Sequence, residues 1–237
     1  MEAQLILSGR DAKREALLKS PLFQAMTPQE LDETLKFAVE RRCQRGSMIF
    51  QKGDEGTSLM AVLAGRVKIS SISAEGKEIT LNQINEGEIF GEIALLDGKQ
   101  RSADATAAED TLLLVVERRH FLPFVRNNDD LYLRLLAVIC DRLRRTCLAL
   151  EELALFDLPA RLARVLLKMA EDYGRPAIGG GMRIDMKLSQ RDLSTLVASS
   201  RESVNKQMQS WRKGGVVDMD AGYIVVRSAS ELAMLVE

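Results

Sequence analysis

Two charged residues with neighbours suited to phosphate chemistry lie in the middle of the chain. Arg101 is followed by Ser102, and together they supply a fixed cation and a hydroxyl, the groups that hold a phosphate. Glu92 offers a carboxylate acceptor for sugar hydroxyls, and Gly91 before it allows a close backbone approach. The pattern indicates a site for a sugar phosphate, and a surface ion pair between Glu92 and Arg101 is the alternative.

A second candidate site lies near the C-terminus, where two short helices are predicted. Ser189 is an N-cap with Asp192 as a capping-box acid, and residues 198–200 break the pattern. A second helix from about Arg201 to Arg212 would bury its apolar residues and expose Arg201, Glu202, Asn205 and Lys206. This is typical of a helix-turn-helix, whose second helix reads base edges in the major groove. A purely structural helix pair is the alternative.

The charge distribution favours contact with nucleic acid in the same region. The chain has 33 basic and 34 acidic residues, a net charge of −1. From Leu158 onward there are 12 basic and 9 acidic residues, and the interval 183–213 holds seven basic and three acidic ones. Gly214 and Gly215 end the second helix, and residues 216–219 and 223–226 around Asp220-Ala221-Gly222 predict a hairpin, or wing, beside it.

The elements that must position the first site are short strands. Apolar runs at 48–50, 59–63, 67–72, 79–84 and 112–116 are separated by glycines, which is typical of an antiparallel sandwich or roll. Before them, Thr27 caps a helix that begins with Pro28 and places Leu31, Leu35 and Val39 on one face. After them, residues 173–181 predict a loop and 183–188 a strand.

A long helix is predicted from Asp129. Its apolar residues recur at alternating spacings of three and four and define the heptad seam: Leu133, Leu136, Cys140, Leu143, Cys147, Leu150 and Ala154. The seam predicts pairing with a second copy of the chain, and packing within one domain is the alternative. Leu131, Leu135 and Ile139 form a second stripe facing the strands. Asp157 and Pro159 begin a new helix to about Asp172, which marks a hinge.

In these residues the sequence resembles the cyclic-AMP receptor protein (Crp/Fnr) family of bacterial transcription regulators. Phe-Gly-Glu-Ile-Ala-Leu with Arg-Ser-Ala resembles the phosphate-binding cassette of that family, and Ser-Ser-Arg-Glu-Ser-Val at 199–204 resembles the start of its recognition helix. The resemblance implies an α+β fold with a jelly-roll-like β-roll (1–127), a dimerisation helix (128–156) and a winged helix-turn-helix (157–237). It implies a cytoplasmic homodimer that binds promoter DNA, cyclic nucleotide and RNA polymerase, with the 175–181 loop as a candidate polymerase contact.

The resemblance also assigns residues. For the nucleotide it implies that Glu92 holds the ribose, that Arg101 and Ser102 hold the phosphate, and that Thr146 meets the base. Further residues implied at this site are Gly91, Ile93, Ala94, Ala103, Leu81, Asn82, Arg142 and Cys147. Cys147 stands where the cyclic-AMP receptor protein has a serine, so cyclic GMP is kept beside cyclic AMP as an effector. For DNA the implied residues are Gln190, Arg191, Ser200, Arg201, Glu202, Ser203 and Lys206.

Other classes of protein fit the sequence less well. An iron–sulfur sensor needs clustered cysteines, which this sequence lacks. A haem sensor usually needs His or Cys in the roll, and the sole histidine of the chain, His120, follows the last predicted strand. A hydrolase using Glu92 with His120, or Cys147 as nucleophile, lacks any ordered catalytic set, so no catalytic or metal-binding residues are predicted. A nucleotide-binding subunit without DNA activity and a ligand-independent regulator remain alternatives. No secretion signal is found in residues 1–10, and the three cysteines lack CxxC spacing.

Overall fold

The computed structural model describes residues 10–220 and 222–236, so the start of the chain and Ala221 of the predicted wing turn lie outside it. The chain divides into two compact units, one formed by residues up to 71 and 80–145, the other by 72–79 and 146–237. Within the described ranges, no helix is long and apolar enough to cross a membrane.

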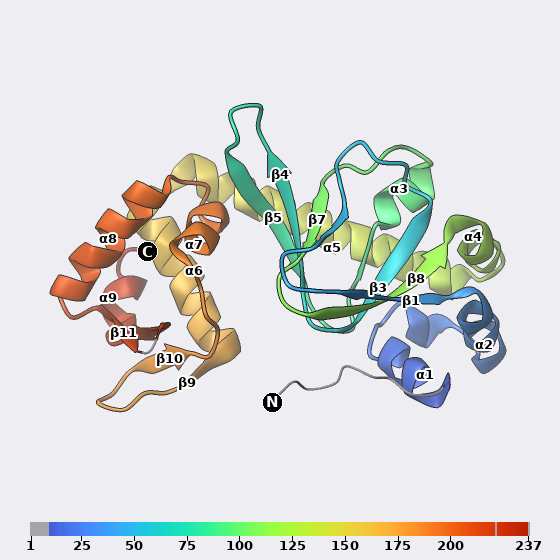
Figure 1. The fold of residues 1–237 in the computed structure, drawn as a ribbon, viewed down its shortest axis with the longest axis horizontal. Helices are drawn as coiled ribbons and strands as arrows, with labels where there is room; N and C mark the ends of the chain where they lie inside the picture. The colour runs from blue at the N-terminus through green and yellow to red at the C-terminus, as the bar shows by residue number, and fades with distance from the viewer. Residues whose placement is uncertain (1–9, 221, 237) are drawn as a thin grey trace. The chain divides into compact units, whose positions relative to one another are not determined.

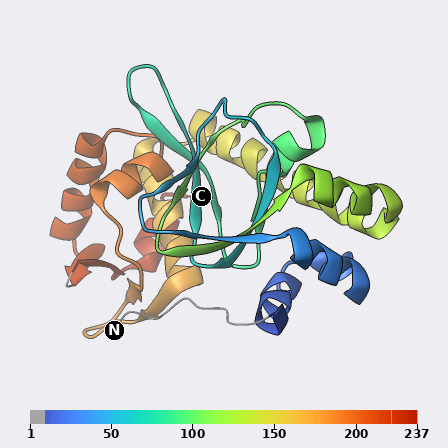
Figure 2. The same ribbon diagram turned by 45° about the vertical axis from the view of Figure 1, so that its right-hand side comes forward.

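The first unit is built on two four-stranded antiparallel sheets (Figures 1 and 2). One sheet has the order β1-β8-β3-β6 and the other β2-β7-β4-β5. The strands are β1 (Val39–Cys43), β2 (Met48–Phe50), β3 (Ser58–Ala64), β4 (Val67–Ile72), β5 (Glu78–Ile84), β6 (Ile89–Phe90), β7 (Asp104–Ala107) and β8 (Thr111–Glu117). The five strands predicted from sequence are present. β1, β6 and β7 were missed because they are short or, in β1, largely polar.

β3 and β8 are buried on both faces, which explains their continuous apolar runs. Leu59, Ala61 and Leu63 of β3 pack into a core with the helices of the unit, while Met60 and Val62 enter the core between the two sheets. Adjacent side chains of a strand point to opposite faces, so each face of β3 lines a different core. The roll is therefore anchored at its centre by these paired strands.

Four short helical segments pack beside β3 and β8: α1 (Arg10–Leu18), η1 (Phe23–Ala25), α2 (Pro28–Phe37) and α4 (Arg118–Asn127). α1 contacts β3 and η1, while α2 and α4 contact β8. Thr27 and Glu30 form a reciprocal capping box at the start of α2. The prediction that Val39 shares the helical face of Leu31 is wrong, because α2 ends at Phe37 and Val39 begins β1 with 65% of its surface exposed. His120 stacks on Phe37 with ring centroids 4.1 Å apart.

The long helix α5 (Asp129–Leu155) separates its two apolar stripes as predicted. Leu131 and Leu135 are buried in the core of the first unit, with Val138 packed against it. Ile139, the third residue of the predicted stripe, is half-buried and is not among the residues of that core. Every residue of the heptad seam is exposed in the single chain, for example Leu143 at 63% and Leu150 at 67%. One face of α5 therefore belongs to its own unit, and the opposite face is unpartnered within the chain.

The second unit contains α6 (Leu158–Tyr173), β9 (Gly174–Pro176), β10 (Met182–Ile184), α7 (Gln190–Leu196), α8 (Arg201–Lys213), β11 (Val217–Asp220), β12 (Tyr223–Val226) and α9 (Ala229–Ala233). Asp157 caps α6 through its carboxylate, as predicted. The four strands pair in the order β11-β12-β10-β9. The prediction that 173–181 is entirely loop is wrong, because residues 174–176 pair with β10, and the strand predicted at 183–188 ends at Ile184.

Candidate functional site

The candidate pocket in the first unit is built around a short helix with glycine at both ends. α3 (Glu92–Asp97) lies between Gly91, with φ of 82°, and Gly98, with φ of 71°, both left-handed conformations that favour glycine. A Cβ at position 91 would lie 2.5 Å from Nη1 of Arg101 and 3.1 Å from the carbonyl oxygen of Ser58. Position 91 thus needs glycine both for its backbone angle and to admit the guanidinium.

The guanidinium of Arg101 is held deep in the roll with 4% of the residue exposed. It donates to the carbonyl of Gly91 at 2.9 Å, and to the carbonyl and Oγ of Ser58 at 2.8 and 3.0 Å. It also lies 4.4 Å from the ring centre of Phe50. Burial lowers the pKa of Arg101, and the Glu92 carboxylate opposes that shift. Its Nε–H is buried and has no acceptor among the described residues, so this cation has one donor that makes no hydrogen bond within them.

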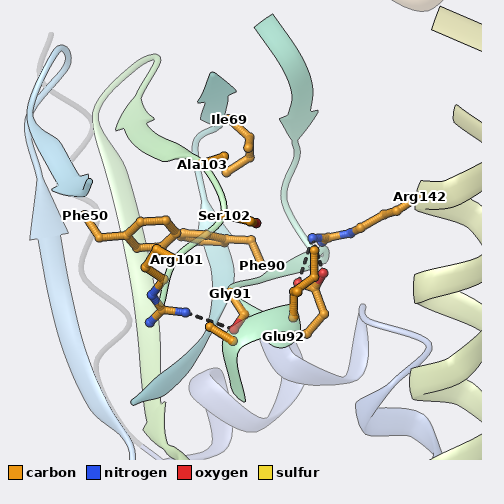
Figure 3. A pocket seen from close by; sticks show the side chains of 11 residues that line it. Phe50, Ile69, Phe90, Gly91, Glu92, Arg101, Ser102, Ala103 and Arg142 are labelled. Carbon is orange, nitrogen blue, oxygen red and sulfur yellow. Dashed lines mark hydrogen bonds and ion pairs between the residues drawn. The ribbon is translucent and has the colours of Figure 1, made fainter. Parts of the chain in front are cut away.

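Glu92 is fully buried and is bound by an arginine from the long helix. Nη1 of Arg142 lies 2.6 Å from both carboxylate oxygens, and Nη2 donates to the carbonyl of Ile89. Burial raises the pKa of Glu92, while the charge and hydrogen bonds of Arg142 act in the opposite direction. The pair holds a carboxylate at the base of the pocket and ties α5 to the roll (Figure 3).

These side chains line one cavity of about 60 Å³ (Figure 3). Eight of the residues predicted for the ligand lie around it: Gly91, Glu92, Ile93, Ala94, Arg101, Ser102, Ala103 and Arg142. Sequence reasoning missed three apolar residues of the lining, Phe50, Ile69 and Phe90. Phe50 and Ile69 were predicted only as parts of strands, and Phe90 only as part of the segment that carries the family resemblance. Leu81, Asn82, Thr146 and Cys147 are not among the residues that line it; Leu81 lies on β5, 49% exposed, and Cys147 is exposed on α5.

The second unit presents a helix-turn-helix, as predicted. Ser189 and Asp192 form a capping box at α7, and Ser200 caps α8 by accepting from the backbone of Ser203 at 3.0 Å. Between the helices Ala198 adopts φ of 49°. α8 buries Val204, Met208 and Trp211 on its inner face. Its outer face exposes Ser200, Arg201, Glu202, Ser203, Asn205 and Lys206. α7 leaves Arg191 exposed and Gln190 half-buried.

A cationic cluster that the sequence did not indicate surrounds the wing. Tyr223, at the start of β12, has Arg183 4.9 Å and Lys187 5.5 Å from its ring centre. Arg183 comes from β10 and Lys187 from the segment before α7, so only the fold brings them together. Arg183 also pairs with Asp185 at 3.3 Å and with Asp220 at 4.0 Å.

Comparison with known proteins bears on both units. Residues 40–128 match the family described as cyclic nucleotide-binding domain, and residues 160–235 match the Crp-like helix-turn-helix domain. The chain is 34% identical to the cyclic AMP receptor protein of Thermus thermophilus, over 90% of its own length and 95% of that protein. The chain belongs to the Crp/Fnr family of transcription regulators. Family membership confirms the predicted β-roll and helix-turn-helix, and the prediction of a regulator rather than an enzyme.

The chain is also similar to other transcription regulators. The CRP-like cAMP-activated global transcriptional regulator of Mycobacterium tuberculosis is 28% identical over 92% of this chain and 97% of that protein. The global nitrogen regulator of Synechocystis is 30% identical over 86% and 92%. The solved Thermus thermophilus catabolite activator protein is 34% identical over 92% and 98%, with a TM-score of 0.51. The c-di-GMP-responsive regulator CLP of Xanthomonas campestris, 19% identical over 85% of this chain and 100% of that one, shares the fold with a TM-score of 0.76.

In the part of the chain that the structure describes, no group of His, Cys, Asp or Glu is arranged to hold a metal ion. The pair considered for hydrolysis, Glu92 and His120, has other partners: Glu92 is bound by Arg142, and His120 stacks on Phe37. The chemistry of the pocket is therefore that of a buried cation and a buried carboxylate next to apolar rings.

Proposed function

We propose that this Crp/Fnr regulator binds a cyclic nucleotide in the roll and, as a homodimer in the cytoplasm, reads a two-fold promoter site. The observation that carries the proposal is the cavity lined by Arg101 and Glu92. The buried Nε–H of Arg101 has no acceptor among the residues that the structure describes. A phosphate provides such an acceptor, and charge-assisted hydrogen bonds to a guanidinium are strong in a buried site.

The two charged residues bind different parts of the ligand in this proposal. Arg101 and the Ser102 hydroxyl hold the cyclic phosphate, and the Glu92 carboxylate accepts from the ribose 2′-hydroxyl. Gly91, Ile93, Ala94 and Ala103 line the sugar phosphate. Leu81 and Asn82 at the rim, and Thr146 and Cys147 toward the base, remain assigned by family resemblance.

Ligand entry requires side-chain movement. The cavity of about 60 Å³ is far smaller than the roughly 300–1,000 Å³ of typical small-molecule sites. Arg142 and Arg101 are the long side chains at its edge, and Arg142 belongs to α5. Nucleotide that displaces Arg142 from Glu92 therefore acts directly on the long helix. A ligand shifts the equilibrium toward the state it binds more tightly, which makes this contact a route for control.

The long helix passes the change toward the DNA-reading unit through a defined junction. Arg164 of α6 lies 3.9 Å from the ring centre of Phe156 and 3.4 Å from the carboxylate of Glu152 in α5. These contacts connect the end of α5 to α6 across Asp157. In a dimer the two α8 helices must lie about 34 Å apart to enter successive major grooves, and we propose that the nucleotide favours this spacing.

The homodimer itself is proposed from the heptad seam, which is exposed along its full length. Two such helices paired in parallel would bury the leucines that the single chain leaves in water. The proposed division is then 1–127 for the nucleotide-binding domain, 128–156 for the dimerisation helix and 157–237 for the DNA-binding domain.

On DNA, we propose that Arg201 and Glu202 read bases in a TGTGA-like half-site and that Lys206 reads one position less sharply. Arginine can give two bonds to guanine and glutamate can accept from cytosine, whereas lysine lacks the planar fork. Ser200 and Ser203 lie at the same end of α8, and Gln190 and Arg191 begin α7. We propose that Gln190 and Arg191 contact phosphates. The 175–181 segment is the proposed contact for RNA polymerase.

The effector is proposed to be cyclic AMP or cyclic GMP, and one experiment tests the function. Binding to a palindromic site is measured by fluorescence anisotropy without ligand, with cyclic AMP, and with cyclic GMP. We expect either nucleotide to tighten binding at least tenfold, and Arg101→Ala to abolish that gain. A response of the variant at wild-type nucleotide concentrations would refute the pocket assignment. Tight DNA binding that neither nucleotide changes would favour a different effector. A regulator that responds to another effector is the second candidate function, because the chain is also similar to a global nitrogen regulator.

A further inference from the structure

Two of the three cysteines lie on the exposed heptad seam. Cys140 and Cys147 are both exposed on α5, whereas Cys43 is buried between the two sheets of the roll. Cys140 and Cys147 are one heptad apart and so occupy the same heptad position. Nothing in the proposed binding of nucleotide or DNA uses a reaction between these thiols.

A disulfide between the two cysteines of one chain is excluded by the helix. Seven residues at about 1.5 Å each separate their backbones by roughly 10 Å along α5. A disulfide needs Cα atoms no more than about 7 Å apart. The helix would have to unfold locally before Cys140 could reach Cys147 of the same chain.

A disulfide between two copies is favoured by the same geometry. In a parallel helix pair, each seam residue faces its own counterpart across the two-fold axis. Helix axes pack about 8–10 Å apart and Cα atoms lie about 2.3 Å from each axis, so Cα atoms that face each other directly are about 3.4–5.4 Å apart. This span overlaps the roughly 4.4–6.8 Å range of disulfides, which the more widely spaced helix pairs reach. Exposed leucines at 136, 143 and 150 alternate with the cysteines and would hold the two helices in register.

We infer that Cys140 and Cys147 each form an interchain disulfide with the same cysteine of a second copy when the protein meets a two-electron oxidant such as a peroxide. The inference rests on the proposed homodimer. It adds an oxidation site to a regulator whose proposed effector is a nucleotide.

The chemistry needs only the two thiols and the peroxide. One thiolate attacks a peroxide oxygen, which gives a sulfenic acid and, with a proton, releases water from hydrogen peroxide. The facing thiol then attacks the sulfenic sulfur, the S–S bond forms, and a second water leaves. Small thiols reverse the bond by exchange, so in a reducing compartment the cross-link is transient and reports oxidant.

The cross-link changes how the dimer responds to dilution. A covalent dimer cannot dissociate, so its DNA binding no longer depends on the monomer–dimer equilibrium. Two disulfides one heptad apart also prevent the helices from sliding past each other. Oxidation therefore fixes the long-helix pair that the nucleotide is proposed to adjust.

The test treats the full-length protein with hydrogen peroxide, without nucleotide, and analyses it by non-reducing gel electrophoresis and peptide mass spectrometry. The proteins are wild type, C140S, C147S, the C140S/C147S double variant and, as a control, C43S. We expect covalent dimer in wild type, C43S and both single variants, and none in the double variant. Peptide mapping should find Cys140 joined to Cys140 and Cys147 joined to Cys147. Circular dichroism checks that each variant is folded.

Sedimentation of the reduced protein separates the inference from the proposal beneath it. A reduced dimer that gives no covalent dimer with peroxide would overturn the disulfide and leave the homodimer standing. A reduced monomer at micromolar concentration would overturn both. Cross-links between Cys140 and Cys147 would show a staggered or antiparallel helix pair and would overturn the in-register arrangement. Covalent dimer formed by the double variant would assign the reaction to Cys43.

Discussion

The substitution Glu92→Gln isolates the carboxylate proposed to bind the ribose. In the proposed complex the nucleotide displaces Arg142 from Glu92, and the carboxylate accepts from the ribose 2′-hydroxyl, so an amide of the same shape replaces the charged acceptor with a neutral one. A hydrogen bond to a charged group contributes roughly 1.5–3 kcal/mol. Since about 1.4 kcal/mol changes Kd tenfold, the variant should bind cyclic nucleotide roughly 10- to 150-fold more weakly.

The assay is calorimetric titration with cyclic AMP and cyclic GMP, and the chain offers a matched control. Glu88 also pairs with an arginine of α5, Arg145 at 3.7 Å, but it lies outside the cavity. Glu88→Gln should leave Kd within about threefold, because exposed ion pairs contribute little. If Glu92→Gln folds normally and binds as tightly as Glu88→Gln, Glu92 is not the sugar acceptor.

The same carboxyl predicts a pH dependence with a definite sign. Burial raises the pKa of Glu92 above the ordinary value of 4.5, so acidification neutralises it earlier than an exposed glutamate. Nucleotide affinity should therefore fall as the pH falls through this raised pKa, and Glu92→Gln should lose that dependence. Folding stability should not fall with it on account of Glu92, because the native state takes up this proton before the unfolded chain does. Titrations from pH 7.5 downward, with thermal unfolding at each pH, check both statements.

Three further predictions concern the Arg101 side chain, the DNA-reading helix and the two faces of α5. Arg101→Lys should weaken nucleotide binding at least tenfold in calorimetry, because a single ammonium cannot replace the forked contacts of the guanidinium; near-normal Kd would count against a phosphate at Arg101. Arg201→Ala should lose about 1–3 kcal/mol of specific DNA binding in anisotropy titrations, whereas the exposed Lys168→Ala on α6 should lose little; equal effects would remove Arg201 from base reading. Leu135→Ala should lower the free energy of unfolding of the first unit by about 2–5 kcal/mol, because Leu135 is buried in its core. Leu143→Ala should mainly weaken dimerisation, measured by sedimentation. A reversal of these two effects would contradict the assignment of the α5 faces.

The sequence predicted those parts of the fold whose signals are local. Thr27, Asp157 and Ser189 each begin a helix by accepting a hydrogen bond from its first turn, and a capping residue carries that information by itself. The strand β1 was missed, since Val39–Cys43 is mostly polar and is a strand because it pairs with β8. Pairing between distant segments has no local signature.

The pocket shows the same division between local and distant signals. Arg101 and Glu92 were predicted from residue type and from resemblance, and the structure places both around one cavity. The stacking of Arg101 on Phe50, and the Arg183–Tyr223–Lys187 cluster at the wing, depend on side chains that only the fold brings together. For the same reason the sequence did not predict that Arg142 binds Glu92 from the long helix.

The burial of Trp211 on the inner face of α8 has an optical consequence. It is the sole tryptophan of the chain, and it is 8% exposed in the core of the second unit. Emission excited selectively in tryptophan therefore originates in the helix that carries Arg201 and Glu202, while the β-roll contributes none. A denaturant titration followed by tryptophan emission reports unfolding of the DNA-reading unit. The same titration followed by far-ultraviolet circular dichroism reports unfolding of both units. The separation of the two curves measures, in an unlabelled protein, how far the units unfold independently.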